Sequence, residues 1–125
     1  MELKFYKCNI CGKIIIMLNE VSTPTICCGE MMSPIVPGTT DAAVEKHVPV
    51  ISKNGNLVEV TVGEVEHPMT GEHYIQWIVL QTKNGIQRKN LSPTDKPSAA
   101  FALLDNDEVI AAYAYCNLHG LWKSN

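Results

Sequence analysis

The feature that most constrains this chain is the way its cysteines and histidines are distributed. Four of the five cysteines fall within the first 28 residues, whereas Cys116 stands three residues before His119, near the end. An odd number of cysteines, in a chain whose start lacks the pattern of a secretion signal, indicates metal ligation rather than disulfides. We therefore expect a metal site in each part of the chain.

The amino-terminal cysteines have a spacing that suits a tetrahedral metal site. Cys8 and Cys11 form a C-x-x-C pair, which lets two thiolates bind one ion. Cys27 and Cys28 are adjacent, so both reach the same ion only if the backbone turns there, which Gly29 permits. Four thiolates suit either zinc or iron, and the ion would also stabilise a segment too short for its own core. The alternative, four buried free thiols, is disfavoured by this spacing.

The sequence predicts an all-β protein. In the first part we expect strands over Lys4–Lys7 and Ile14–Leu18, followed by a boundary over 33–40 with the linker near Pro37. Beyond it, short alternating runs are separated by turns such as Asn54-Gly55. These runs cover residues 48–51, 57–62, 73–82, 86–91, 100–104 and 108–116.

About seven short strands with turns between them are typical of an antiparallel sandwich of immunoglobulin-like size. In the run 73–82, strict alternation would place His73, Ile75, Trp77 and Val79 on one face. A competing interpretation makes the alanine-rich segment Val109–Tyr115 a helix, but its Val, Ile and Tyr residues favour a strand.

A second metal site is suggested by residues at strand ends and in loops. His47 is expected at the start of a strand, His67 lies in a loop before a proline, and His73 opens a strand. Cys116 and His119 have ligand spacing of their own. Any one of these histidines alone is more simply a surface or core residue that binds no metal. That interpretation becomes less plausible when it must hold for all four histidines at once.

Convergence of four imidazoles and one thiolate would restrict the metal. Zinc prefers four ligands, whereas iron(II) accepts a square of nitrogens with an axial sulfur and keeps a sixth position open. An electron-rich axial thiolate favours giving an electron to a small oxygen species bound opposite. Two other hypotheses stay open at this point: an iron protein that only carries electrons, and a zinc-stapled binding module without redox function.

Charge and hydropathy exclude other classes of function. Ten basic and thirteen acidic residues give a formal charge of −3 with scattered signs, so the chain lacks the basic footprint of a nucleic-acid-binding protein. No run of about 18 apolar residues is present to span a membrane. We expect a cytoplasmic location with no membrane and no nucleic-acid partner.

Taken together, several motifs resemble desulfoferrodoxin, the two-iron class of superoxide reductase. They are Cys8-x-x-Cys11, Cys27-Cys28, Glu45-Lys46-His47-Val48-Pro49, His67-Pro68-Met69, His73-Tyr74-Ile75 and Cys116-Asn117-Leu118-His119-Gly120-Leu121-Trp122. The resemblance covers the whole chain and implies two domains. Residues 1–37 would form a desulforedoxin-like domain whose iron is bound by Cys8, Cys11, Cys27 and Cys28. Residues 38–125 would form the superoxide reductase sandwich, whose second iron has His47, His67, His73 and His119 in its equatorial plane and Cys116 axially.

The resemblance also implies an activity and its residues. The expected reaction is one-electron reduction of superoxide to hydrogen peroxide, a detoxification in oxidative stress, with electrons from rubredoxin or a similar small donor. Lys46 would attract superoxide and organise water for protonation, and Glu45 would approach the open position of the oxidised iron after product leaves. Relatives are commonly homodimers, which we expect here as well.

Overall fold

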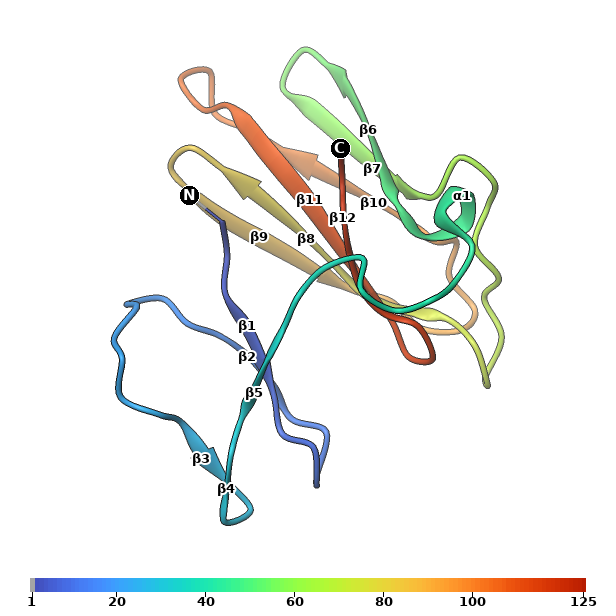
Figure 1. Cartoon of the computed structure of the whole chain (residues 1–125). Helices are drawn as coiled ribbons and strands as arrows, with labels where there is room; N and C mark the ends of the chain where they lie inside the picture. Colours follow the sequence, from blue (N-terminus) through green and yellow to red (C-terminus); the bar gives the residue numbers. More distant parts are fainter. Residues whose placement is uncertain (1) are drawn as a thin grey trace. The chain divides into compact units, whose positions relative to one another are not determined.

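The computed structural model describes residues 2–125. The chain divides into two compact units, Met1–Val36 and Pro37–Asn125. Almost all regular structure is β-strand, as the sequence predicts (Figure 1). Within the described residues no helix has the length and apolar character needed to cross a membrane. The two units are described separately below.

The first unit contains two small sheets. Strands β1 (Phe5–Lys7), β2 (Ile14–Ile16) and β5 (Ser33–Ile35) form an antiparallel sheet in the order β2-β1-β5. Strands β3 (Ile26–Cys27) and β4 (Glu30–Met31) form a two-stranded hairpin. Two expectations need correction: β2 is shorter than predicted, and residues 33–35, expected in the boundary, pair with β1.

The second unit is a sandwich of two antiparallel sheets, which confirms the predicted fold class. One sheet has the order β10-β7-β6, formed by Ser98–Ala102, Leu57–Val62 and Pro49–Asn54. The other has the order β12-β11-β8-β9, formed by Gly120–Lys123, Val109–Cys116, Ile75–Thr82 and Gly85–Asn90. A single helical turn, α1 (Val44–His47), precedes β6.

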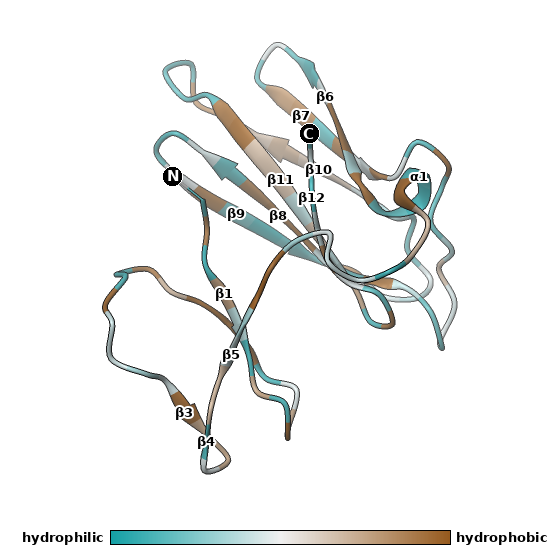
Figure 2. Ribbon diagram, in the orientation of Figure 1, coloured by the Kyte–Doolittle hydropathy of each residue, from teal (hydrophilic) through white to brown (hydrophobic). Residues whose placement is uncertain are grey.

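The core lies between the two sheets and follows from alternation along the central strands. On β7, Val58, Val60 and Val62 are fully buried while the residues between them are exposed. Ala112 and Ala114 of β11 lie in the core opposite β7, where their small side chains let the two sheets pack closely against each other. Figure 2 shows the apolar residues concentrated in the central strands, whereas the edge strand β9 is mainly hydrophilic. Charged, exposed edge strands such as β9 resist pairing with other chains.

The pairing of β8 with β11 is irregular at two places, between Val109 and Ala111 and between Tyr115 and Cys116, and the second corrects the predicted faces of 73–82. Tyr115 pairs with Trp77, but the next residue, Cys116, pairs with Ile75, so β8 carries one extra residue in a β-bulge. Ile75 consequently shares the core with Ile78 rather than a face with Trp77. A bulge is not visible in the sequence pattern, because it reverses the alternation without changing residue types.

Other differences are local. His47 ends helix α1 instead of beginning a strand, and β12 was not predicted. The segment Val109–Tyr115 is strand, so the helical alternative is wrong.

Candidate metal centres

The four amino-terminal cysteines lie together, with their sulfur atoms within 4.8 Å of one another. Cys11 Sγ lies 3.6 Å from Cys27 Sγ, and Cys27 Sγ lies 3.9 Å from Cys28 Sγ. A tetrahedral ion with metal–sulfur bonds of about 2.3 Å requires sulfur–sulfur edges of about 3.8 Å. The cluster therefore has the dimensions of a closed four-thiolate site.

Tight backbone turns place these sulfurs. Cys28 and Gly29 form the two-residue turn of the β3–β4 hairpin, with φ angles of 54° and 78°. Two consecutive left-handed residues are characteristic of a type I′ turn, so the adjacent cysteines can face one ion. On the other side, the backbone N–H of Cys11 points at Cys8 Sγ at 3.4 Å, which closes the C-x-x-C turn.

The thiols perturb one another's ionisation. Hydrogen bonds from the backbone N–H groups of Cys11 and Ile10 lower the pKa of Cys8 to about 6. The neighbouring sulfurs of Cys8 and Cys11 raise the pKa of Cys27 to about 12, and Cys11 likewise raises that of Cys28. The Cys8 thiolate forms readily, whereas the Cys27 and Cys28 thiols resist ionisation beside it, so a cation would stabilise their deprotonated forms.

The second cluster brings together the four histidines from distant parts of the chain. Neighbouring imidazoles are edge to face, with interplanar angles of 80–82°. Their centroids are separated by 4.7 Å for His47–His67 and His67–His73, by 5.0 Å for His73–His119 and by 4.9 Å for His47–His119. The opposed pair His47 and His73 is 6.4 Å apart, close to the diagonal of a square with such sides. The rings thus form a square around a common centre.

The ring nitrogens face this centre. His47 Nδ1 donates to Ala43 O and His67 Nδ1 donates to Pro68 O, each at 2.7 Å. Both neutral rings then carry their lone pairs on Nε2, and these two Nε2 atoms are only 3.2 Å apart. His47 Nε2 also lies 3.1 Å from His119 Nδ1. Lone pairs this close repel unless a cation lies among them, and edges of this length suit metal–nitrogen bonds of about 2.1 Å.

Burial of the histidine rings also makes their nitrogens suited to bind a metal. His73 Nε2 is buried without a hydrogen-bond partner among residues 2–125, as expected of an atom that binds an ion. Burial lowers the pKa of His67 to about 4 and lowers those of His47 and His73 as well. At neutral pH these rings are therefore uncharged and have lone pairs available.

Cys116 is the fifth member of this cluster. Its sulfur is completely buried, lies 3.9 Å from His119 Nδ1 and is within 4.8 Å of the donor nitrogens of His47, His67 and His73. Burial raises the pKa of the Cys116 thiol, while the backbone N–H groups of His119 and Leu118 oppose that rise. The thiolate thus has hydrogen-bond donors of its own, and a metal would supply the remaining stabilisation.

Different elements deliver these side chains to one end of the sandwich. His47 ends α1, His67 follows β7 and His73 precedes β8. Cys116 ends β11, and His119 is the last residue of the β11–β12 turn. The approach of α1 to β7 is close at Gly63, where an added Cβ would lie 2.6 Å from Glu45 O and 3.0 Å from His47 N. Only glycine allows this approach.

Sequence reasoning missed Trp122 as part of the site. Its indole ring lies 4.9 Å from the His47 ring, centroid to centroid, and its Nε1 donates to His119 O at 3.0 Å. The signals were its position three residues after His119 and its place at the end of the Cys116–Trp122 motif.

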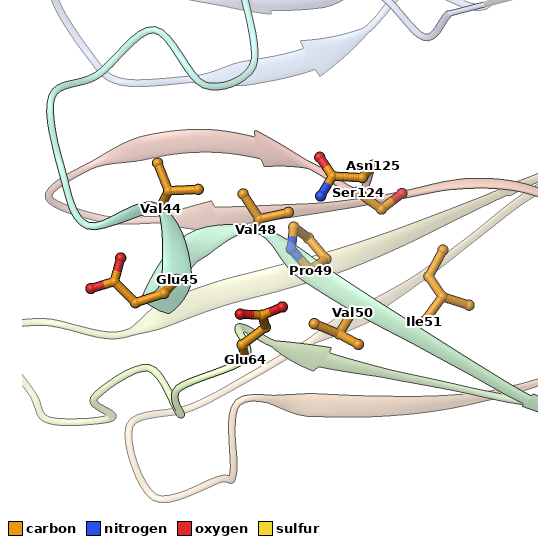
Figure 3. Close-up of a pocket in the computed structure, with 9 residues that line it drawn as sticks. All are labelled: Val44, Glu45, Val48, Pro49, Val50, Ile51, Glu64, Ser124 and Asn125. Atoms are coloured by element: carbon orange, nitrogen blue, oxygen red, sulfur yellow. The ribbon is translucent and has the colours of Figure 1, made fainter.

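Glu45 and Lys46 lie on the exposed side of α1. Burial is the main cause of the lowered pKa of His47 and His73, and the charge of Lys46 adds a smaller contribution in the same direction. Glu45 borders a pocket of about 460 Å³ between the start of β6 and the chain end, shown in Figure 3. The residues lining this pocket are Val44, Glu45, Val48, Pro49, Val50, Ile51, Glu64, Ser124 and Asn125, none of which belongs to either cluster.

Both donor sets fit iron. Thiolates alone suit iron or zinc, while four imidazoles in a square with a thiolate exceed the four ligands that zinc normally takes. The second cluster therefore discriminates between the metals in a way that the first does not.

Comparison with known proteins agrees with this chemistry. The family described as Desulfoferrodoxin matches residues 39–125, and the Desulfoferrodoxin N-terminal domain matches residues 1–35. A desulfoferrodoxin homolog of Archaeoglobus fulgidus is 43% identical over 122 residues, covering 98% of this chain and 96% of the relative. The desulfoferrodoxin of Nitratidesulfovibrio vulgaris is 46% identical over 123 residues, with the same coverage. The crystal structure of the superoxide reductase from Treponema pallidum covers 100% of both chains at 42% identity, with a TM-score of 0.85. This chain belongs to the desulfoferrodoxin family.

Proposed function

We propose that this protein is a superoxide reductase, which converts superoxide to hydrogen peroxide with one external electron and two protons. The observation that carries the proposal is the square of four imidazoles with a buried thiolate beside it. Five protein donors leave an octahedral ion with one position for a small substrate. The kinship with a structure described as a superoxide reductase supports the same activity.

The protein binds two iron ions, and we assign their ligands as follows. The first is bound by Cys8, Cys11, Cys27 and Cys28, whose four thiolates leave no open position. The second is bound by Nε2 of His47, His67 and His73, by Nδ1 of His119 and by Sγ of Cys116. Iron at this second centre supplies, when bound, the electron that reduces superoxide.

Two charged side chains on α1 serve the reaction. Lys46 attracts the superoxide anion and orders water that delivers protons to the product. Its position next to His47 and its influence on His47 and His73 support this role. Glu45 would be the carboxylate that approaches the open side of the second centre after product leaves. Its exposure on the same helical turn leaves it free to move.

The two centres belong to separate domains. We assign residues 1–37 to a desulforedoxin-like domain and residues 38–125 to the superoxide reductase sandwich. The division into compact units Met1–Val36 and Pro37–Asn125 supports these bounds to within one residue.

The electron donor is a rubredoxin or a similar small carrier, the protein is a homodimer, and it acts in the cytoplasm. The free cysteines support a cytoplasmic location, because cysteines that bind metal stay reduced where disulfides do not form.

The activity is tested by measuring the products of a single turnover with superoxide. Reduced, iron-loaded protein is mixed with superoxide generated by pulse radiolysis, and peroxide and dioxygen are measured. A reductase gives one peroxide per superoxide without dioxygen, whereas dismutation releases dioxygen. Release of dioxygen would refute the proposal, and so would failure of the second centre to oxidise. Azide binding to the oxidised second centre distinguishes the reductase from an electron carrier, whose closed site ignores azide.

The role of Lys46 is tested by Lys46→Ala against the matched variant Lys53→Ala. Lys53 is also exposed and lies toward the opposite end of β6 from His47. Lys46→Ala should slow the reaction with superoxide and reduce its dependence on ionic strength, while leaving the visible spectrum intact. Equal rates and equal salt dependence in the two variants would remove Lys46 from the mechanism.

A further inference from the structure

Asn117 stands between two residues of the second cluster, Cys116 and His119, and is half-buried. Its side-chain amide does not bond within its own turn. Oδ1 accepts a hydrogen bond from the backbone N–H of Tyr74 at 3.0 Å, and Nδ2 donates to Glu72 O at 3.0 Å. The backbone N–H of Asn117 adds a third bond, to Tyr74 O at 3.2 Å.

The two residues that Asn117 holds are the neighbours of His73 in the chain. His73 lies before β8, outside the regular ladder, where strand pairing does not fix its backbone. On its other side, Thr70 and His73 exchange backbone hydrogen bonds at 2.9 and 3.3 Å, which form a compact turn. The amide of Asn117 therefore connects this turn directly to the turn that carries Cys116 and His119.

The β-bulge lies where the pairing of β11 with β8 ends, which explains why the bonds of Asn117 are needed. Beyond the pairing of Cys116 with Ile75, the ladder between β11 and β8 ends. The ring of His73 must nevertheless keep its edge-to-face position 5.0 Å from the ring of His119. An asparagine side chain has both an acceptor and a donor, so it can supply the backbone hydrogen bonds that a longer ladder would make to the residues on either side of His73.

We propose that Asn117 is a positioning residue of the second metal centre: its amide fixes His73 relative to Cys116 and His119. The inference rests on the proposed ligand set. A side chain that only stabilised the β11–β12 turn would bond inside that turn, whereas this one spans the two ligand-bearing segments.

The variants are Asn117→Ala, which removes both side-chain bonds, and Asn117→Asp, which keeps an acceptor for Tyr74 N–H but places an oxygen against Glu72 O. The matched control is Asn56→Ala, which removes an exposed side-chain bond to Asp105. Full-length protein loaded with iron is used throughout. The measurements are iron release to a chelator at each centre and the EPR spectrum of the oxidised second centre.

Asn117→Ala should weaken iron binding at the second centre by about ten- to a hundredfold, as loss of partners that orient ligands does. Its EPR spectrum should change, while the four-cysteine centre, read by its own visible bands, stays unchanged. Asn117→Asp retains the size and the bond to Tyr74 N–H but loses the bond to Glu72 O, so it should fold and also change the second centre in the same direction. Asn56→Ala should match the wild type.

Release rates and EPR spectra within error of the wild type in both Asn117 variants would overturn the inference, and so would equal loss of iron from the two centres. Failure of the proposed function is distinguishable. In that case the wild type itself would lack iron at the second centre or would not react with superoxide, whatever residue occupies position 117.

Discussion

Replacing Gly63 with alanine should damage the second centre without touching a ligand. The added Cβ would lie 2.6 Å from Glu45 O, 2.8 Å from Lys46 C and 3.0 Å from His47 N. Ordinary contacts begin near 3.4 Å, so the backbone of α1 must retreat by about 0.8 Å, the difference between 3.4 and 2.6. All three neighbours are backbone atoms, so no flexible side chain can absorb the change.

The expected cost is about 1–3 kcal/mol of unfolding free energy, the usual range for overpacking. The shift also exceeds the tolerance of about 0.5 Å within which a site must be held, so His47 should leave its place in the square. The hydrogen bond from Val65 N to Glu45 O, 2.9 Å long, would be strained by the same movement.

The assay combines chemical denaturation with iron content and the visible spectrum of the second centre. Gly71→Ala is the matched control, because an added Cβ there meets nothing within 4 Å and Gly71 lies in the loop between His67 and His73. Gly71→Ala should behave like the wild type. The reasoning is refuted if Gly63→Ala unfolds within about 0.5 kcal/mol of the wild type and keeps full iron at the second centre.

Three further outcomes are expected. Leu118→Pro deletes an N–H that stabilises the Cys116 thiolate, so it should shift the reduction potential and visible absorption of the second centre; an unchanged potential in a folded variant would contradict this. Trp122→Phe loses the bond to His119 O and should cost about 1 kcal/mol with a perturbed spectrum, measured by denaturation and absorption; wild-type values for both would argue against a role for the indole. Because the pKa of His67 is about 4 in the fold and 6.5 in the unfolded chain, the unfolded chain binds more protons between these values. The metal-free protein should therefore have its full unfolding free energy above pH 6.5 and lose part of it progressively toward pH 4. Chemical denaturation at several pH values measures this, and an unfolding free energy that stays constant between pH 6.5 and pH 4 would exclude the effect.

Much of the site was predictable because metal ligands are rare residue types with restrictive spacing. Cys27 and Cys28 required a backbone turn, and the structure has one, with Cys28 itself in the left-handed region. The strands of the sandwich were predictable where alternation holds, as on β7.

The remainder depends on contacts between distant segments. The single turn of α1 has no helical periodicity to detect, and the bulge on β8 reverses the side-chain faces without any change of composition. The bonds of Asn117 to the neighbours of His73 join residues more than 40 positions apart. Such contacts become visible only in three dimensions.

The central claim is that four imidazoles and one thiolate from across the chain bind a single iron. The most direct measurement is a crystal structure of the iron-loaded protein with anomalous scattering at the iron edge. We predict one iron among the nitrogens of His47, His67, His73 and His119, with Cys116 Sγ on one side and no protein ligand opposite it in the reduced state. An iron that lacks any of these five ligands, or that is closed by a sixth protein ligand in the reduced state, would contradict the account.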